Sequence, residues 1–413
     1  MASSQHESTF QISISEKAIT QLHEKLALTS LPSELEDAEW EYGSPLKDIQ
    51  RLVNRWRDEY DWRKHEAALN NELPQFTRDI EVEDFGKLNI HYVHKKSELE
   101  SAIPLLFVHG WPGSFIEVRK ILPLLIKSTP EHPSFHVVAL SLPGYGFSEA
   151  PSKKGFALPQ YAEVGHKLMI ALGYDEYVTQ GGDWGSFITR KMSHLYGPSY
   201  HKAQHTNLPL AVPPNPSRPM LYISHLLSGL PGLSYTAAEQ AGIARTQEFH
   251  SKGSGYFAQH STRPQTLGYA LEDSPAGLLA WIYEKLVRWT DAYKWDDDEV
   301  LTWISLYHFS RAGPAASIRI YYEIMKARGS RPVPQSERLS PIPLGHSYFP
   351  KDIIVLPRSW CKIPNLIFES DHGSGGHFAA HEKPQELVGD LRKMFGKGGA
   401  AFGVVKGRNG YAS

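Results

Sequence analysis

A short glycine-rich stretch, "QGGDWGS" (Gln180–Ser186), holds the side chain with the clearest chemical potential in this 413-residue sequence. Its glycines at 181 and 185 have the spacing of a nucleophile elbow, G-x-S-x-G, with Asp183 in the place of serine. Small neighbours allow the sharp turn from strand to helix that such an elbow requires. A carboxylate that attacks an sp³ carbon forms an ester, which water can cleave in a second step, whereas serine would form an ether. We therefore predict that Asp183 is a nucleophile in an alkylating reaction; an Asp that caps the next helix is the alternative.

Cleavage of such an ester needs a general base that activates water, and the sequence offers 20 histidines. His377 follows "GSGG" after the last strand-like run, where a loop can bring it back over the elbow. His372 belongs to the same loop, and His381 is expected on the following helix. We predict that His377 is the base.

A histidine base needs a carboxylate that holds its tautomer and stabilises the imidazolium ion. Asp352 follows "LGHSYFPK" at the end of the penultimate predicted strand. Asp371 lies only six residues before His377 and suits a loop turn, and Glu369 ends a strand. Asp352 is the predicted partner of His377.

These side chains must be positioned by a regular framework of strands and helices. "IPLLFVHG" (Ile103–Gly110) and "FHVVALSLPGYGFS" (Phe135–Ser148) begin as short apolar runs and end in glycine, as buried parallel strands do. Residues Tyr161–Gly173 have helical spacing and a glycine stop. Residues Glu176–Gly197 predict strand, elbow and helix in that order. Alternation of this kind predicts a mostly parallel, doubly wound α/β sheet.

The flanking regions have a different pattern. The segment before about residue 93 is polar, contains tryptophan and is helical in pattern, as in Ser44–Trp62. Between Leu208 and Leu344 the chain is dense in Trp, Tyr and Leu and predicts helices, either a lid with an apolar pocket wall or a plain helical core. Strand-like runs return at Leu344–Phe349 and Pro364–Ser370. The predicted regions are an N-terminal extension (1–93), a first core part (94–207), a helical lid (208–343) and a second core part (344–413).

Composition and net charge do not suggest nucleic acid or a membrane as a partner. With 41% hydrophobic and 21% charged residues, the chain fits a globular protein, and a net charge of −2 gives no reason to expect nucleic acid or an anionic membrane. The one cysteine, Cys361, allows no intramolecular disulfide. The start, Met1–Lys17, lacks the basic and apolar regions of a signal peptide, and no run approaches a membrane span. The expectation is a soluble, cytoplasmic protein.

Several stretches together resemble the epoxide hydrolases of the microsomal type, a branch of the α/β-hydrolase superfamily. They are "HGWPGSF" (His109–Phe115), "GGDWGS" (Gly181–Ser186), "DSPAGLLAWIYEK" (Asp273–Lys285), "RIYYE" (Arg319–Glu323) and "GGHFAAHEKP" (Gly375–Pro384). The resemblance runs in order over nearly the whole chain and implies an α/β-hydrolase fold with a helical lid. The membrane anchor of the mammalian members has no counterpart here, so the sequence resembles soluble members such as those of fungi.

The resemblance also implies site residues. The chain order Asp183, Asp352, His377 is that of nucleophile, acid and histidine in α/β-hydrolases. The backbone N–H groups of Trp111 and Trp184 correspond to an oxyanion hole, which stabilises the tetrahedral intermediate. His109 is expected to shape its loop and to take no part in the chemistry.

The departing epoxide oxygen needs a proton donor, and the family uses a pair of lid tyrosines. The matching residues are Tyr256 in "GSGYF" and Tyr321 in "RIYYE", among 20 tyrosines. Tyr322 would point about 100° away from Tyr321 on a helix, so only one of the two can face the pocket.

The remaining features imply no cofactor. "WDDDEV" (Trp295–Val300) places three aspartates and a glutamate at a predicted helix start, where they complement the helix dipole, so no metal is expected. "LPGYGFS" (Leu142–Ser148) lacks the context of a dinucleotide fingerprint. The implied partners are an epoxide and water, and the resemblance implies a homodimer. Two biological roles remain open: detoxification, including catabolism of aromatic hydrocarbons, and a biosynthetic step. A haloalkane dehalogenase and a catalytically silent hydrolase-fold receptor are the rival functions.

Overall fold

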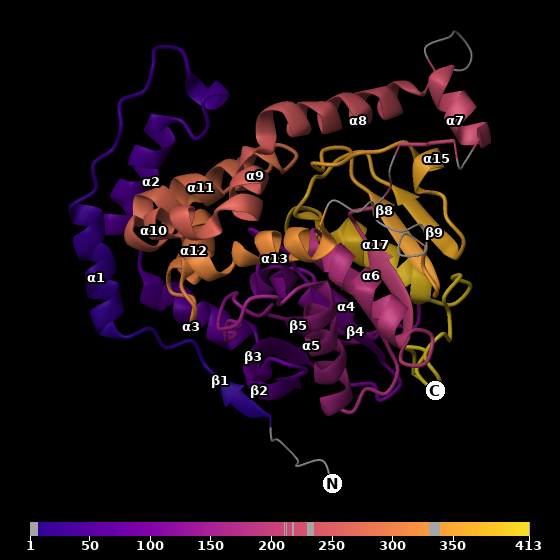
Figure 1. Cartoon of the computed structure of the whole chain (residues 1–413). Coiled ribbons are helices and arrows are strands. Elements are labelled where there is room, and N and C mark those ends of the chain that lie inside the picture. The colour runs from indigo at the N-terminus through magenta and orange to yellow at the C-terminus, as the bar shows by residue number, and fades with distance from the viewer. Residues whose placement is uncertain are drawn as a thin grey trace.

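One large sheet organises the protein. The computed structural model describes residues 7–209, 211, 213–216, 219–228, 235–329 and 339–412. Within these residues, nine strands form a sheet in the order β1-β2-β3-β5-β4-β6-β7-β8-β9 (Figure 1). Pairing is parallel from β5 to β9 and antiparallel among β1, β2, β3 and β5, which confirms the mostly parallel sheet. The strands are β1 (Ser8–Phe10), β2 (Gln75–Val82), β3 (Gly86–Lys95), β4 (Ile103–Val108), β5 (Phe135–Leu140), β6 (Tyr177–Gly181), β7 (His201–Thr206), β8 (Leu344–Tyr348) and β9 (Leu366–Asp371).

Helices cover the sheet and extend beyond one edge of it. Helices α5 and α6 pack together as one layer, and α4 and α17 pack together as another. The strands between them, β4 and β5, are buried along their whole length, as expected for strands covered on both faces. The helices are α1 (Glu16–Ala27), α2 (Leu46–Asp58), α3 (Trp62–Glu72), α4 (Leu122–Ile126), α5 (Leu158–Ala171), α6 (Trp184–Tyr196), α7 (Pro219–Leu226), α8 (Ala237–Glu248), α9 (Gly255–Thr262), α10 (Pro264–Asp273), α11 (Pro275–Arg288), α12 (Asp297–His308), α13 (Arg319–Arg328), α15 (Arg358–Cys361), α16 (Ala379–Glu382) and α17 (Pro384–Phe395).

The N-terminal region contains both helices and strands. The apolar face predicted for residues 44–62 forms α2, whose Ile49, Leu52, Val53 and Trp56 are buried. The expectation of a helical pattern up to about residue 93 is wrong for residues 75–93, which form β2 and most of β3. Polar residues alternate through β2 because this hairpin lies near the sheet edge with one face toward solvent, and that alternation hides the strand in a search for apolar runs.

Helices α7 to α13 lie between β7 and β8 in the chain, and the N-terminal helices pack against them. Helix α1 contacts α11, α2 contacts α11 and α12, and α3 contacts α12 (Figure 1). Two ion pairs with solvent-accessible side chains join the same regions, Lys25 to Asp273 at 3.1 Å and Arg55 to Asp298 at 2.7 Å. Exposed pairs of this kind contribute roughly 0–1 kcal/mol each, so the apolar faces of α1 and α2 carry most of the contact energy.

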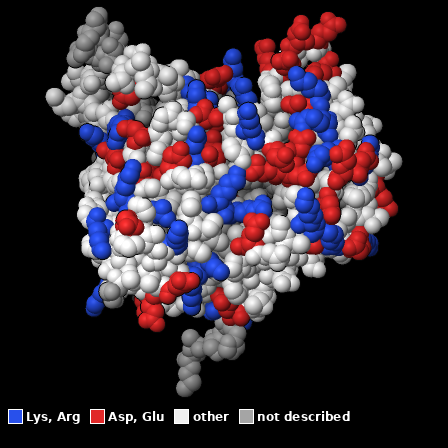
Figure 2. Space-filling model, turned by 180° about the vertical axis from the view of Figure 1, so that it is seen from behind, with Lys and Arg blue, Asp and Glu red and all other residues white. Residues whose placement is uncertain are grey.

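The surface has no dominant charge on the face drawn in Figure 2, where basic and acidic side chains alternate. A mixed face lacks the single-sign field that steers polyanions. Among the described residues, no helix combines the length and hydropathy that crossing a bilayer requires. Residues 1–6, which belong to the segment expected to lack a signal peptide, and parts of the predicted lid between 210 and 338 lie outside the described residues.

Candidate active site

Asp183 occupies a sharp turn between β6 and α6. Its backbone angles are φ 46° and ψ −128°, a strained conformation for a residue with a side chain. A Cβ atom on Gly185 would lie 1.9 Å from the carbonyl oxygen of Val108, and one on Gly181 would lie 2.5 Å from the carbonyl oxygen of Gly185. Only glycine fits at these two positions, and this explains the spacing seen in the sequence.

The structure brings Asp183, Asp352 and His377 together from three separate parts of the chain. His377 Nδ1 donates to Asp352 Oδ1 at 2.7 Å, and His377 Nε2 lies 3.3 Å from Asp183 Oδ2. Asp183 follows β6, Asp352 follows β8 and His377 follows β9. All three therefore lie at the carboxyl ends of parallel strands, where α/β proteins build their sites.

The loop that carries His377 is held by backbone contacts on both sides. The His377 N–H donates to the carbonyl oxygen of Trp289 at 2.8 Å, and the Lys351 N–H donates to that of Gly375 at 2.9 Å. A Cβ atom on Gly376 would lie 2.4 Å from the same Trp289 oxygen. The glycines before His377 thus let the loop pass close to α11 and to the Asp352 loop, which fixes the position of the imidazole.

Trp111 contributes a backbone donor to the Asp183 carboxylate. Its N–H donates to Asp183 Oδ1 at 2.8 Å. A Cβ atom on the preceding Gly110 would lie 2.0 Å from the same oxygen, so this loop approaches the carboxylate as closely as glycine allows. Trp184 begins α6, where backbone N–H groups lack a partner within the helix. Both predicted oxyanion-hole residues therefore lie next to Asp183.

The charges around His377 favour its protonated form. Burial by itself lowers the pKa of His377, but the carboxylates of Asp352 and Asp183 outweigh it and raise the pKa to about 10. The His377 ring lies between the Asp352 and Asp183 carboxyl groups, and the Trp111 N–H donates to the other oxygen of Asp183. Asp183 therefore has a neighbour at each of its two carboxyl oxygens.

Tyr256 and Tyr321 lie in an aromatic cage above the elbow. Tyr256 stacks on Trp111 with ring centroids 5.2 Å apart, and Tyr321 makes an edge contact with Trp184 at 4.9 Å. The two tyrosine ring centroids are 5.9 Å apart. The Trp289 ring lies 5.3 Å from that of Tyr256, and the Trp289 carbonyl oxygen accepts from the His377 N–H. Burial and the nearby Asp183 charge raise the pKa of both phenols well above the ordinary value, so both hydroxyls carry their protons. The Tyr321 hydroxyl has no hydrogen-bond partner among the described residues.

Two polar residues near the site were not identified from the sequence. His260 lies one helical turn after Tyr256 and is fully buried, with its ring 4.7 Å from Trp111 and 4.8 Å from Tyr321. Its Nε2 accepts from Trp281 Nε1 at 3.1 Å, and burial lowers its pKa to about 3, so it is a neutral part of the cage. Its helical spacing from Tyr256 was the one signal in the sequence.

Glu117 is the second such residue. It lies in the 3₁₀ helix Phe115–Arg119, where its carboxyl packs against Gly113. Burial raises its pKa to about 8, the charge of Asp183 adds to this effect and that of His377 opposes it. No spacing rule distinguishes this glutamate from the others in the sequence.

The alternative histidines have partners elsewhere. His372 Nε2 lies 2.6 Å from Asp390 Oδ2, and His381 Nε2 lies 2.8 Å from Glu299 Oε1. His109 bridges two loops, since its Nδ1 contacts the carbonyl oxygen of Gly110 and its Nε2 accepts from the Leu142 N–H.

The alternative carboxylates and the neighbouring tyrosine are also engaged outside the site. Asp371 and Glu369 both pair with Arg358. Tyr322 is half-buried and has Lys326 over its ring, on the same helix in which Tyr321 is fully buried. Only one of these adjacent tyrosines thus reaches the cage.

The acidic run at Trp295–Val300 forms a helix start. The Asp296 side chain caps α12 by accepting from the N–H groups of Asp298 and Glu299. Among the described residues, no group of three or more His, Cys, Asp or Glu side chains is arranged to hold a metal ion.

Comparisons with known proteins identify the family of the chain and structures with a similar fold. A family model described as the N terminus of epoxide hydrolases matches residues 7–118, and one described as the alpha/beta hydrolase fold matches residues 103–276. Epoxide hydrolase 1 of Sus scrofa is 37% identical over 94% of this chain and 88% of its own length. The structure of Aspergillus niger epoxide hydrolase is similar with a TM-score of 0.80 and 38% identity, over 94% of this chain and 95% of that one. Juvenile hormone epoxide hydrolase of Bombyx mori gives a TM-score of 0.82 at 28% identity, over 94% and 93% of the two chains.

Proposed function

The chain belongs to the epoxide hydrolase family, and from this premise we propose that it converts epoxides to vicinal diols through an ester on Asp183. One observation carries the proposal. The Asp183 carboxylate has the Trp111 N–H on one oxygen and His377 beside the other, beneath two buried phenols. This arrangement supplies a nucleophile, an acid for the departing oxygen and a base for water.

In the first half-reaction, Asp183 Oδ2 attacks a ring carbon of the epoxide. The carbon–oxygen bond of the ring breaks, and its electron pair goes to the departing oxygen. Tyr256 or Tyr321 donates a proton to that oxygen, since both are neutral phenols in the cage. Oδ1 remains on the Trp111 N–H and becomes the carbonyl oxygen of the ester.

In the second half-reaction, His377 removes a proton from water, and the hydroxide formed attacks Cγ of Asp183. Negative charge then develops on Oδ1, where the N–H groups of Trp111 and Trp184 stabilise it. The bond from Cγ to Oδ2 breaks, and the imidazolium gives its proton to the released alkoxide. The proton left on the new Asp183 carboxyl group then passes to His377, which restores the free enzyme. Asp352 stabilises that imidazolium through its 2.7 Å hydrogen bond.

Formation of the ester prepares His377 for its role as a base. In the free enzyme the charges of Asp352 and Asp183 raise its pKa to about 10, so it is protonated at pH 7 and cannot accept a proton. Alkylation neutralises Asp183 and removes one of these two charges, so the pKa of His377 falls. The proton that the imidazolium then loses replaces the one that the phenol gave to the epoxide oxygen. Water activation thereby becomes available only after the nucleophile has reacted.

The same argument predicts the pKa of His377 in an Asp183→Asn variant, whose amide imitates the neutral ester. Removal of one adjacent charge should lower it by roughly one to three pH units relative to the unchanged enzyme. NMR titration of ¹⁵N-histidine-labelled protein measures this shift, and the signal missing from a His377→Gln sample identifies the residue. Equal titration midpoints in both proteins would contradict the proposed effect of ester formation.

Isotope labelling tests the covalent route. In a single turnover in ¹⁸O-water with excess enzyme and styrene oxide, the first diol should be unlabelled, because its new oxygen comes from Asp183. The label should then be found by peptide mass spectrometry in the Asp183 peptide. A first diol that carries solvent oxygen would show direct attack by water.

Further properties are proposed from the resemblance. We propose a homodimer in the cytoplasm that takes part in detoxification, including the catabolism of aromatic hydrocarbons. Light scattering coupled to size exclusion tests the dimer, and cell fractionation tests the location. A monomer at micromolar concentration would contradict the proposed homodimer.

A further inference from the structure

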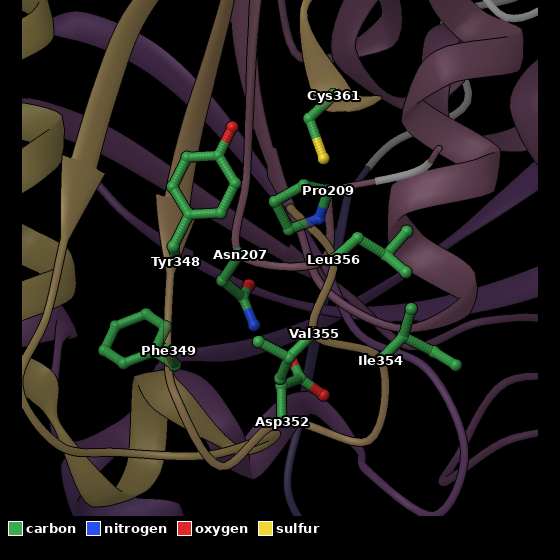
Figure 3. Close-up of a pocket in the computed structure, with 9 residues that line it drawn as sticks. All are labelled: Asn207, Pro209, Tyr348, Phe349, Asp352, Ile354, Val355, Leu356 and Cys361. Atoms are coloured by element: carbon green, nitrogen blue, oxygen red, sulfur yellow. The ribbon is translucent and has the colours of Figure 1, made fainter. Parts of the chain in front are cut away.

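A small cavity lies beside the acid of the triad. Its volume of about 20 Å³ is enough for one water molecule and for little more. Figure 3 shows the side chains that surround it. They are Asn207, Pro209, Tyr348, Phe349, Asp352, Ile354, Val355, Leu356 and Cys361.

The Asp352 carboxylate is only partly satisfied by protein donors. Its Oδ1 accepts from His377 Nδ1 at 2.7 Å and from the Ile353 N–H at 2.6 Å. Its Oδ2 is buried and has no donor among the described residues. An ionised carboxylate can accept about four hydrogen bonds, and buried acceptors are nearly always paired with protein or water. The oxygen without a protein donor belongs to a residue of the cavity wall.

Asn207 supplies a donor on the same wall. Gln180 Nε2 donates to its Oδ1 at 2.8 Å, so the NH₂ group is the other end of the amide. One N–H of that group reaches the His377 carbonyl oxygen at 3.4 Å, a long contact, and the second remains to donate. In Figure 3 the Asn207 nitrogen points toward the part of the cavity where Val355 and Asp352 lie. Asn207 is 5% exposed, so bulk solvent does not satisfy this group.

We propose that this cavity is a binding site for one buried water molecule, which donates to Asp352 Oδ2 and accepts from Asn207 Nδ2. The water is the third hydrogen-bond donor to Asp352. It also connects Asp352 to Asn207, which contacts both Gln180 and the His377 loop. The remaining wall is mostly apolar, so few other polar groups compete for a water molecule in this space.

The role of this water in the reaction rests on the proposed function. Donors to Asp352 hold its charge in place opposite His377, and that charge matters when the imidazole takes a proton from the hydrolytic water. Alkylation by Asp183 needs no proton transfer to His377. The bound water should therefore support ester hydrolysis and leave alkylation almost unchanged.

A crystal structure of the unliganded enzyme at high resolution tests the site directly. We expect one density peak within roughly 2.6–3.2 Å of both Asp352 Oδ2 and Asn207 Nδ2. A cavity without such a peak, or a peak that contacts neither atom, overturns the proposal. This test does not depend on the reaction, so its failure is distinct from a failure of the proposed function.

Two variants of the chain's one cysteine test the consequence. Cys361 lines the cavity opposite the polar wall (Figure 3), so Cys361→Met should fill it, while Cys361→Ala removes the same thiol and leaves the space. In single-turnover kinetics with styrene oxide, Cys361→Met should slow ester hydrolysis roughly tenfold, the effect of about one hydrogen bond to a charged group. Alkylation followed by tryptophan fluorescence should be unchanged, and Cys361→Ala should resemble the unchanged enzyme in both steps.

The other outcomes contradict the proposal. An equal decrease in the rate of ester hydrolysis in both variants would assign the effect to the thiol. An unchanged rate in both would mean that the cavity does not support Asp352. Equal slowing of both half-reactions by Cys361→Met would indicate general disturbance of the fold. If Cys361→Met does not fold, as judged by circular dichroism, the crystal structure of the unchanged enzyme decides the proposal by itself.

Discussion

A His377→Gln variant is expected to react with one equivalent of epoxide and then stop. Attack by the Asp183 carboxylate needs no base, and Trp111 still holds its Oδ1. Activation of water does need the base, so ester hydrolysis should slow by roughly 10²–10⁴-fold. Intact mass spectrometry after mixing with styrene oxide should show the protein mass increased by one substrate molecule.

His372→Gln is the matched control for this experiment. The same change is made in the same loop, but His372 is paired with Asp390 and lies outside the triad. It should turn over without accumulation of ester. If the His377 variant turns over normally, or if the His372 variant accumulates ester instead, the assignment of the base is wrong. Asp352→Asn should slow the same step as His377→Gln, because its amide stabilises imidazolium less and allows the wrong tautomer.

Loss of both phenols at Tyr256 and Tyr321 should nearly abolish alkylation. The departing oxygen would then leave as an alkoxide within an aromatic cage, without the proton that positioned acid catalysis supplies. Each single Tyr→Phe change should cost only part of the roughly 10²–10⁴-fold expected of such catalysis, since one donor remains. Stopped-flow tryptophan fluorescence measures alkylation, because Trp111 and Trp184 contact the two tyrosines.

Tyr322→Phe provides the control within the same helix. Tyr322 is adjacent to Tyr321 but only half-buried, with Lys326 over its ring, so its loss should not affect alkylation. Parallel assays with a chloroalkane separate the proposed function from dehalogenation, since chloride needs no proton to leave. Alkylation by the double Phe variant at the unchanged rate would show that both tyrosines only pack, and release of chloride by the unchanged enzyme would favour the rival function.

Features set by neighbouring residues could be predicted without the fold. The elbow at Asp183 depends on glycines two residues away on either side, and the observed turn from β6 to α6 follows from that local frame. The apolar runs of β4 and β5 are recognisable because covered parallel strands are apolar throughout. Strands β2 and β3 were not predicted, because a hairpin near the sheet edge with one face toward solvent has alternating polar residues and no continuous apolar run.

Features that depend on the order of strands in the sheet were decided only by the tertiary structure. The sequence offered three histidines and three carboxylates for two roles, and the chain alone determined no distance among them. Because β6, β7, β8 and β9 are neighbours in the sheet, their carboxyl ends bring His377 to 2.7 Å from Asp352 and 3.3 Å from Asp183, while His372 and His381 pair elsewhere. Asn207 beside Asp352 carries no sequence signature, and His260 in the cage has only its helical spacing from Tyr256, since both are defined mainly by contacts with residues distant in the chain. The sequence by itself indicated the candidate nucleophile and the alternation of strands and helices, because both patterns are formed by adjacent residues. The tertiary structure decided which histidine, which acid and which phenols lie around Asp183, because only packing sets distances between residues far apart in the chain.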